Sequence, residues 1–379
     1  MATNITAPPL AGVKVVEIAG LGPAPLACLM LAELGADVIR VEPTTKKGQF
    51  LPLDPAKDLD RQGRQILRLD LKSDKGREAF LELVSVADVL VEGLRPGAME
   101  RLGLGPTETT ERNQRLIYGR MTGYGQDGPL AKRAGHDLNY IALTGVLNAI
   151  GRAGERPVPP LNLIGDYGGG TMFLLVGVLA ALFERERSGK GQVVDVAMVD
   201  GASMLAATLM SLIEHGLWRD RRGENLLDGG SPFYDTYETS DRKFISVACL
   251  EPQFFAEFAR LLPLDESLAA SQYDRRKWPE MRAAIAQRVS EKSRTEWAAL
   301  FDETDACVAP VLNFAEAKAH PHNVARGLYT ETDRPRPAPR FSRTEQSLAG
   351  APETVNESAL LRFGLSQEQA VRLARLSGE

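Results

Sequence analysis

Apolar and polar residues alternate along the first 200 positions in short blocks that predict strands and helices in turn. Residues 13–18 and 38–41 are compact apolar runs of the length expected for buried strands. Between them, a turn over 20–25 precedes residues 26–34, whose apolar spacing predicts a helix that Gly35 ends. This strand–helix–strand order is a βαβ unit, which implies a parallel sheet.

The same pattern continues to about residue 215. The further elements it predicts are a helix over 75–85, strands over 88–91 and 116–120, a helix starting near 137, a helix over 171–185, a strand over 193–199 and a helix over 202–215. Residues 219–230 are charged and rich in glycine, which is typical of a linker.

A different pattern follows the linker. Two β-rich runs over 234–237 and 244–248 flank Ser-Asp-Arg-Lys and predict a hairpin, and helices are expected over 252–262, 280–289 and 295–301. Residues 333–345, rich in Pro and Arg, predict an extended arm before a helix over 366–376. The sequence therefore predicts an α/β fold with a large parallel-sheet domain over 1–220 and a smaller α+β domain over 225–315.

Composition narrows the class of protein. A chain of 379 residues that is 44% hydrophobic can fill two cores, and a net charge of −5 argues against binding to nucleic acid through overall charge. Cys28, Cys249 and Cys307 are far apart, without a disulfide or zinc spacing, which fits a reducing compartment. The apolar run over 172–183 is too short to span a bilayer, and no signal peptide is apparent. We therefore expect a cytoplasmic protein that is not bound to a membrane.

The turn after the first strand imitates a dinucleotide-binding fingerprint. Gly20-x-Gly22 follows a strand, and Glu42 ends the next one. Pro25 stands where a third glycine is needed, and Pro23 lacks an N–H that would bind a pyrophosphate. A turn that only builds the sheet is therefore the better interpretation.

Two stretches place a proton-transfer side chain beside glycine and before a helix. His136 lies in Gly-His-Asp ahead of an apolar helical stripe, and Asp166 lies between Gly165 and a Tyr-Gly-Gly-Gly turn. Burial would raise the pKa of Asp166 while the helix end would lower it, so the sequence leaves the direction open. Taken alone, Asp166 is better explained as a helix cap, and His136 as a helix cap or a surface side chain.

A series of motifs runs in order along nearly the whole chain. Its members are Gly-Ala-Asp-Val-Ile-Arg at 35–40, Leu-Asp-Leu-Lys at 69–72, Val-Glu-Gly-Leu-Arg-Pro-Gly at 91–97, Gly-His-Asp at 135–137, Gly-Asp-Tyr-Gly-Gly-Gly at 165–170 and Glu-Pro-Gln-Phe at 251–254. Together they resemble the family III CoA-transferase superfamily, and within it most closely the branch of α-methylacyl-CoA racemases. Each motif is weak alone, but their co-occurrence is specific.

The resemblance implies a fold, a partner and a reaction. It implies the family III CoA-transferase fold as a homodimer of interlocked chains, in which residues 320–379 complete the large domain and both chains contribute to each active site. The implied reaction interconverts (R)- and (S)-2-methylacyl-CoA through an enolate, with His136 and Asp166 as the paired acid and base. Glu251 would orient or charge His136 from the small domain; alternatively it is a helix-start acid before Pro252.

Binding of the substrate is also implied by the resemblance. CoA is part of the substrate, and no other cofactor and no metal are expected. The candidates for the CoA phosphates and the thioester are Arg40, Lys72, Arg95, Arg101, Gly135, Asp137 and Tyr140. Arginine forks match phosphate oxygens, but solvated surface charge is the usual role of such residues. Tyr140, like the weaker candidate Tyr124, is equally well explained as a core residue.

Other functions remain open at this level. A CoA-transferase would use Asp166 as a nucleophile through an aspartyl-CoA thioester and would not need His136. An acyl-CoA-binding protein without turnover would need neither side chain. The Gly-His-Asp triplet and Glu251 favour the racemase.

Overall fold

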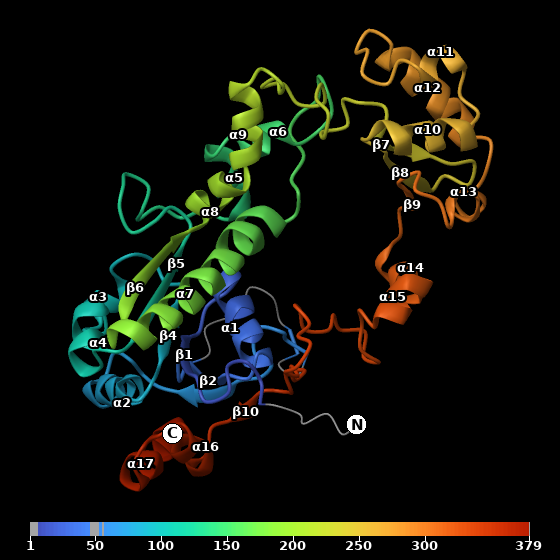
Figure 1. The fold of residues 1–379 in the computed structure, drawn as a ribbon. Helices are drawn as coiled ribbons and strands as arrows, with labels where there is room; N and C mark the ends of the chain where they lie inside the picture. Colours follow the sequence, from blue (N-terminus) through green and yellow to red (C-terminus); the bar gives the residue numbers. More distant parts are fainter. Residues whose placement is uncertain (1–6, 46–52, 55–56, 379) are drawn as a thin grey trace. The chain divides into compact units, whose positions relative to one another are not determined.

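The computed structural model describes residues 7–45, 53–54 and 57–378, which divide into two compact units (Figure 1). Unit 1 comprises Met1–Thr144, Pro160–Ala206 and Pro337–Glu379, and unit 2 comprises Gly145–Pro159 and Ala207–Arg336. These bounds differ from the expected domains, 1–220 with 320–379 and 225–315, because residues 145–159, 207–224 and 316–336 all group with unit 2. Within unit 2, the Arg222 side chain donates to the backbone carbonyls of Asn148 and Glu155, and these bonds tie residues 145–159 to this unit.

Unit 1 is built on a seven-stranded sheet in which every pair of neighbours is parallel. The strand order is β10-β3-β2-β1-β4-β5-β6, so the chain moves to one side of β1 and then returns to the other. The strands are β1 (Lys14–Ile18), β2 (Asp37–Glu42), β3 (Gln65–Arg68), β4 (Val89–Glu92), β5 (Ile117–Thr122), β6 (Gln192–Ala197) and β10 (Glu353–Thr354). Ligands of open parallel sheets bind at such a reversal, beyond the carboxyl ends of the strands.

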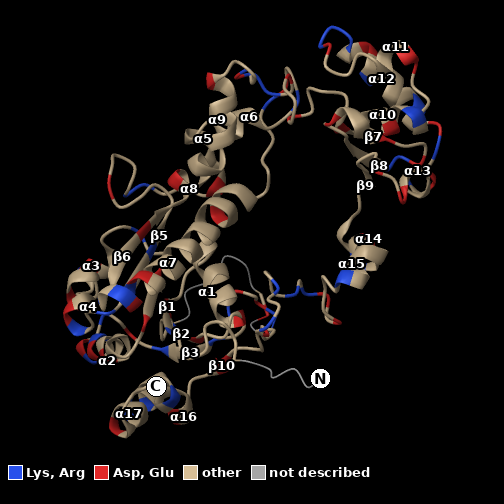
Figure 2. Ribbon diagram, in the orientation of Figure 1, with Lys and Arg blue, Asp and Glu red and all other residues tan. Residues whose placement is uncertain are grey.

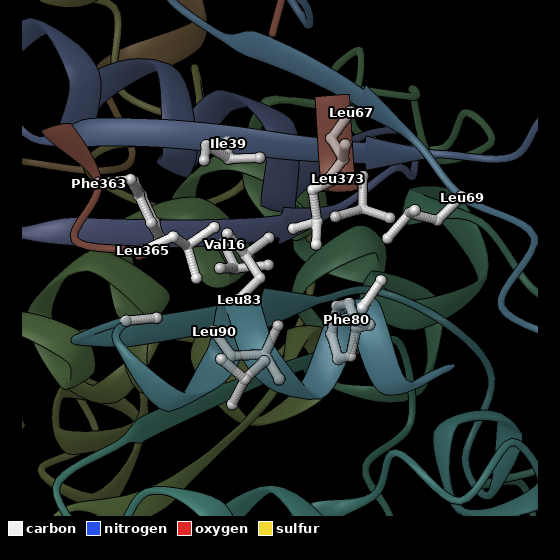
Figure 3. Close-up of a cluster of buried hydrophobic side chains, with 14 of the residues drawn as sticks. Val16, Ile39, Leu67, Leu69, Phe80, Leu83, Leu90, Phe363, Leu365 and Leu373 are labelled. Atoms are coloured by element: carbon white, nitrogen blue, oxygen red, sulfur yellow. The ribbon is translucent and has the colours of Figure 1, made fainter. Parts of the chain in front are cut away.

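Helices cover both faces of this sheet. The helices of unit 1 are α1 (Pro23–Glu33), α2 (Asp74–Ser85), α3 (Ala98–Arg101), α4 (Pro106–Arg112), α5 (Asp137–Leu143), the π-helix η1 (Leu163–Thr171), α7 (Met172–Ser188), α8 (Met198–Leu205), α16 (Glu357–Arg362) and α17 (Gln367–Gly378). Alternate strand residues face opposite ways: Val15 packs with α1 and α7, and Val16 with α2, α16 and α17. Figure 3 shows the second core, in which Leu373 lies with Val16 and Phe80.

The helices depart from the sequence expectation at glycine and proline. Helix α1 begins at Pro23 rather than at residue 26, because proline fits the first turn of a helix. The stripe that begins at Asp137 is broken after Leu143, because Gly145 adopts a φ of 82° before α6. The single helix expected over 202–215 is two helices, α8 in unit 1 and α9 in unit 2.

Helix α7 continues directly from η1, so Leu163–Ser188 forms one helical segment of 26 residues. This segment is long and apolar enough to cross a membrane, although the apolar run alone was expected to be too short. Leu174, Val178 and Leu182 of α7 instead lie in the core against the sheet.

Unit 2 contains a three-stranded antiparallel sheet of order β7-β8-β9 packed against helices. The predicted hairpin is confirmed as β7 (Tyr234–Glu238) paired with β8 (Phe244–Ala248). The other elements of unit 2 are α6 (Val146–Ala149), α9 (Ala207–Glu214), α10 (Pro252–Leu261), α11 (Glu266–Ala269), α12 (Trp278–Val289), α13 (Arg294–Phe301), β9 (Val308–Pro310), α14 (Phe314–Ala319) and α15 (Pro321–Arg326). Phe233, Phe255 and Trp278 stack edge to face in its core.

Candidate active site

The proton-transfer residues of unit 1 lie on segments that follow the carboxyl ends of β1 and β5. The turn after β1 places Gly22 beside Asp166: a Cβ on Gly22 would lie 3.7 Å from the Asp166 Oδ2. The Thr171 hydroxyl at the end of η1 donates to the Pro23 carbonyl over 2.8 Å, which holds η1 against the same turn. The turn that imitates a dinucleotide site is therefore part of the surroundings of Asp166.

His136 immediately precedes α5 and is exposed. Its backbone N–H donates to the Asn139 side chain over 3.1 Å, an arrangement that fixes the start of the helix. The Tyr140 hydroxyl donates to the Gly135 carbonyl, one residue before His136. Both contacts hold the backbone of His136 and leave its imidazole open to a substrate.

Asp166 lies in the first turn of η1 and is half-buried. Its backbone N–H donates to Asp137 Oδ2 over 2.7 Å, and its Oδ2 accepts from Asn162 Nδ2 over 3.1 Å. Since Asp137 directly follows His136, this contact joins the two helix starts. The segments that carry His136 and Asp166 are thus held together, and the pairing of the two side chains as acid and base stays a prediction.

The ionisation of Asp166 is shifted by these surroundings. Burial raises the pKa of the Asp166 carboxyl above its ordinary value, the Asn162 hydrogen bond opposes that rise, the Asp137 charge adds to it, and the His136 imidazole opposes it. Burial is the largest of these causes, so the net direction of the shift is upward. A raised pKa is what a carboxyl group needs in order to hold a proton as well as accept one.

Two tyrosines form one wall of this region. Tyr124, after β5, packs edge to face with Tyr140 at a centroid distance of 4.9 Å. Burial raises the pKa of Tyr140 to about 12, with the nearby Tyr124 and Asp166 acting in the same direction and the cation of Arg95 acting against them. Tyr140 is thus a buried, neutral hydroxyl beside Asp166 and Arg95.

The four candidate cations lie in different settings. Arg95 and Arg101 are exposed after β4, and Lys72 is exposed after β3. Arg40 is only 6% exposed, and its guanidinium is paired with Glu17. Three of the four are therefore accessible to a phosphate, and Arg40 is mainly engaged within the sheet.

Glu251 lies in unit 2, at the residue before α10. Its side chain is exposed and accepts no capping hydrogen bond from that helix. Its position before Pro252 fits the helix-start reading, and its role towards His136 stays a prediction.

Sequence reasoning missed Asn162 as a partner of Asp166. The spacing of four residues was the available signal, because it places both side chains on one side of a helical turn. It also missed that Asp137 binds the Asp166 backbone. The second oxygen of Asp137, Oδ1, is buried without a hydrogen-bond partner within the part of the chain that the structure describes.

The parallel sheet has helices on both faces, which defines an α/β protein. A histidine and an aspartate lie beyond the carboxyl ends of its strands, a placement suited to proton transfer on a small bound group. The chain belongs to CoA-transferase family III, whose family model matches residues 10–359. Among solved structures, a CaiB/BaiF family protein from Brucella suis superposes with a TM-score of 0.77 at 26% identity, covering 94% of this chain and 99% of that one. The parallel-sheet architecture expected from the resemblance is confirmed.

Two named relatives have a higher sequence identity to this chain than that solved structure has. An α-methylacyl-CoA racemase of Mus musculus is 44% identical over 373 residues, and one of Homo sapiens is 41% identical over 372 residues; each alignment covers 96% of both chains. An acetyl-CoA:oxalate CoA-transferase of Acetobacter aceti is 31% identical over 337 residues, 84% of this chain and 85% of that one.

Proposed function

We propose that this protein is a racemase that interconverts (R)- and (S)-2-methylacyl-CoA thioesters. The observation that supports the proposal is the hydrogen bond between Asp137 and the Asp166 backbone, which joins the segments that carry His136 and Asp166. The identity of 41–44% to relatives named α-methylacyl-CoA racemase supports the same reaction.

The chemistry needs two groups on opposite sides of one carbon. One group removes the α-proton, the thioester carbonyl carries the resulting enolate charge, and the second group returns a proton to the other face. For one enantiomer the Asp166 carboxylate accepts the proton and His136 supplies one; for the other enantiomer the roles reverse. The raised pKa of Asp166, caused chiefly by burial, favours the protonated form that the reverse direction needs.

In our proposal, the CoA moiety extends from His136 and Asp166 to the exposed cationic side chains. Gly135, Asp137 and Tyr140 line the thioester, and Arg95, Arg101 and Lys72 bind phosphate oxygens. Arg40 is close to the same edge of the sheet but contributes chiefly by holding Glu17. CoA is carried by the substrate, so the reaction requires no further cofactor, and we place it in the cytoplasm because all three cysteines are free thiols.

We further propose that two copies of the chain form the working enzyme. Helix α7 presents Met172, Val176, Leu179 and Phe183 to solvent at helical spacing, and Val193 is exposed on the edge strand β6 beside it. An apolar stripe of this kind on a folded protein is typical of an interface. Glu251 of one chain would then serve His136 of its partner.

Mixing two inactive variants tests the shared site. His136→Ala and Glu251→Ala chains, refolded together, are expected to regain part of the activity, because a mixed dimer contains one site with neither substitution. Mass spectrometry of the mixture verifies that mixed dimers form. Mixed dimers without any recovered activity would refute the sharing of Glu251, but not the reaction itself.

A CoA-transferase is the second candidate, favoured by the half-buried carboxylate of Asp166 and by the relative from Acetobacter aceti. One incubation separates the two. In deuterium oxide, (R)-2-methylacyl-CoA is expected to gain α-deuterium and become a mixture of epimers. The absence of α-exchange, together with CoA transfer to an added carboxylate, would replace the racemase by the transferase.

A further inference from the structure

Unit 2 contains a cavity of about 540 Å³ that has no part in the chemistry above. It is lined by a glycine-rich loop, by the first residues of α12 and by a cluster of charged side chains. Those side chains are Arg152, Arg219, Arg275, Arg282 and Glu224, so four cations and one anion face the cavity. Figure 2 shows the basic and acidic positions along the chain.

Two of these arginines, Arg152 and Arg282, form ion pairs with the buried carboxylate of Asp235. The side chain of Asp235 is only 6% exposed, accepts from Arg152 Nη1 over 2.6 Å and pairs with Arg282. Arg282 Nη2 also donates to the carbonyls of Gly229 and Gly230, at 2.7 and 2.9 Å. The wall of the cavity is therefore preorganised, because its guanidinium groups are held before any ligand arrives.

The other two arginines have spare hydrogen-bond donors. Arg275 lies over the ring of Trp278, 5.2 Å from its centroid, and has no carboxylate partner among the residues that the structure describes. Arg219 Nη1 is 3.7 Å from Glu224, beyond hydrogen-bond distance. A guanidinium on an aromatic face keeps its edge N–H groups free for an anion.

The loop around the cavity leaves a net positive charge. Four guanidinium groups line the cavity against the single lining carboxylate Glu224. Asp228, another carboxylate of this loop, is engaged by the backbone N–H groups of Gly223, Asn225 and Gly230. The amino end of the twelve-residue helix α12 also lies at the cavity and favours an anion there.

We propose that this cavity binds a small phosphate-bearing anion. Guanidinium forks match the tetrahedral oxygens of phosphate in paired hydrogen bonds, and several forks around one space suit a ligand with more than one charge. The volume exceeds the need of a single carboxylate and admits a diphosphate. Arg219 and Arg275 make the direct contacts, while Arg152 and Arg282 form the fixed wall.

Calorimetric titration of the full chain with inorganic pyrophosphate tests this site. The double variant Arg219→Gln/Arg275→Gln is expected to bind at least about tenfold more weakly, because it loses two charge-assisted contacts with the anion. Arg276→Gln is the matched control: its side chain is 90% exposed, pairs with Asp274 and does not line the cavity. Its affinity is expected to stay within about twofold.

Two further titrations separate this site from the proposed CoA site. The variant Arg95→Gln/Arg101→Gln, which lacks two of the proposed CoA phosphate contacts, is expected to retain the pyrophosphate site that the Arg219→Gln/Arg275→Gln variant loses, and succinate is expected to bind the unmodified protein far more weakly. No binding to the unmodified protein, loss of binding in the Arg95/Arg101 variant, equal binding of succinate, or undiminished binding in the Arg219/Arg275 variant would each overturn the proposal. None of these results bears on racemisation.

Discussion

At the scale of single residues, Asp166 is held between opposing influences. Burial and the charge of Asp137 favour its protonated form, and the Asn162 amide and the His136 imidazole favour the carboxylate. The balance raises its pKa, and the two neighbours Asn162 and Asp137 act on it in opposite directions through separate contacts. These two contacts therefore offer independent control of the acid–base behaviour of the site.

The pH profile of the reaction should reveal this control. In the direction in which Asp166 removes the proton, activity falls as pH drops through its pKa, so the acidic limb of kcat/KM should lie above ~3.9, the ordinary aspartate value. Asp137→Asn keeps an acceptor for the Asp166 N–H but removes the charge, and is expected to move the limb to lower pH. Asn162→Ala removes the opposing hydrogen bond and is expected to move it to higher pH.

The pH profiles of kcat/KM are measured in both directions of the reaction, for the unmodified protein and for the two variants. Limbs that stay fixed in both variants, or that shift the same way, would show that a group other than Asp166 controls activity. Thermal unfolding of each variant serves as the control for folding.

At the scale of elements, the site depends on how closely η1 packs against α8. A Cβ on Gly201 would lie 1.9 Å from the backbone oxygen of Gly169, and one on Gly169 would lie 2.7 Å from the backbone nitrogen of Ala202. Glycine at these positions therefore allows two backbones to touch. That contact positions η1, and with it Asp166.

Gly201→Ala tests this packing against the usual helix preference. Alanine normally stabilises a helix interior relative to glycine by about 1 kcal/mol, but here its methyl group must displace the backbone of η1, which costs about 1–3 kcal/mol. We expect a lower melting temperature and a lower kcat/KM. The control is Gly350→Ala, where the added Cβ would meet nothing within 4 Å. A stabilised, fully active Gly201→Ala protein would refute the packing argument.

The elements also mark the limit of sequence reasoning. Buried strands such as β1 and β2 were predictable, because their apolar runs are continuous, and so was the hairpin of β7 and β8. Strands β3 and β10 were not, since they have four and two residues and pair across 288 positions of sequence. The π-helical form of η1 was likewise hidden, because its glycines predict a turn rather than a helix.

At the scale of the molecule, unit 1 is assembled from segments far apart in the chain. Residues near the C-terminus, including Phe363 and Leu373, share one core with β1 and α2 (Figure 3). On the opposite face of the sheet, Glu17 of β1 pairs with Arg40 of β2 and with Arg64, over 3.0 Å to the Arg64 Nε. This cluster joins strands across the sheet and explains why Arg40 is poorly exposed.

The stability of unit 1 should depend on this cluster. Glu17→Gln leaves the buried guanidinium of Arg64 without its carboxylate and leaves Arg40 with Glu42 alone, which is expected to cost about 3–5 kcal/mol in the free energy of unfolding. Glu78→Gln is the control, because it removes an exposed pair with Arg112 worth about 0–1 kcal/mol. Urea unfolding monitored by circular dichroism gives both values. Equal losses in the two variants would mean that the buried cluster is not a main stabilising feature.

The most direct test of the account is the exchange of the α-proton in variants that retain only one of the two groups. In deuterium oxide, His136→Ala should exchange the α-proton of one epimer of 2-methylacyl-CoA without inverting it, and Asp166→Ala should do so for the opposite epimer. Both should lose racemisation by roughly 10²–10⁴-fold. Exchange of the same epimer in both variants, or full racemisation in either, would contradict a histidine and an aspartate acting from opposite faces.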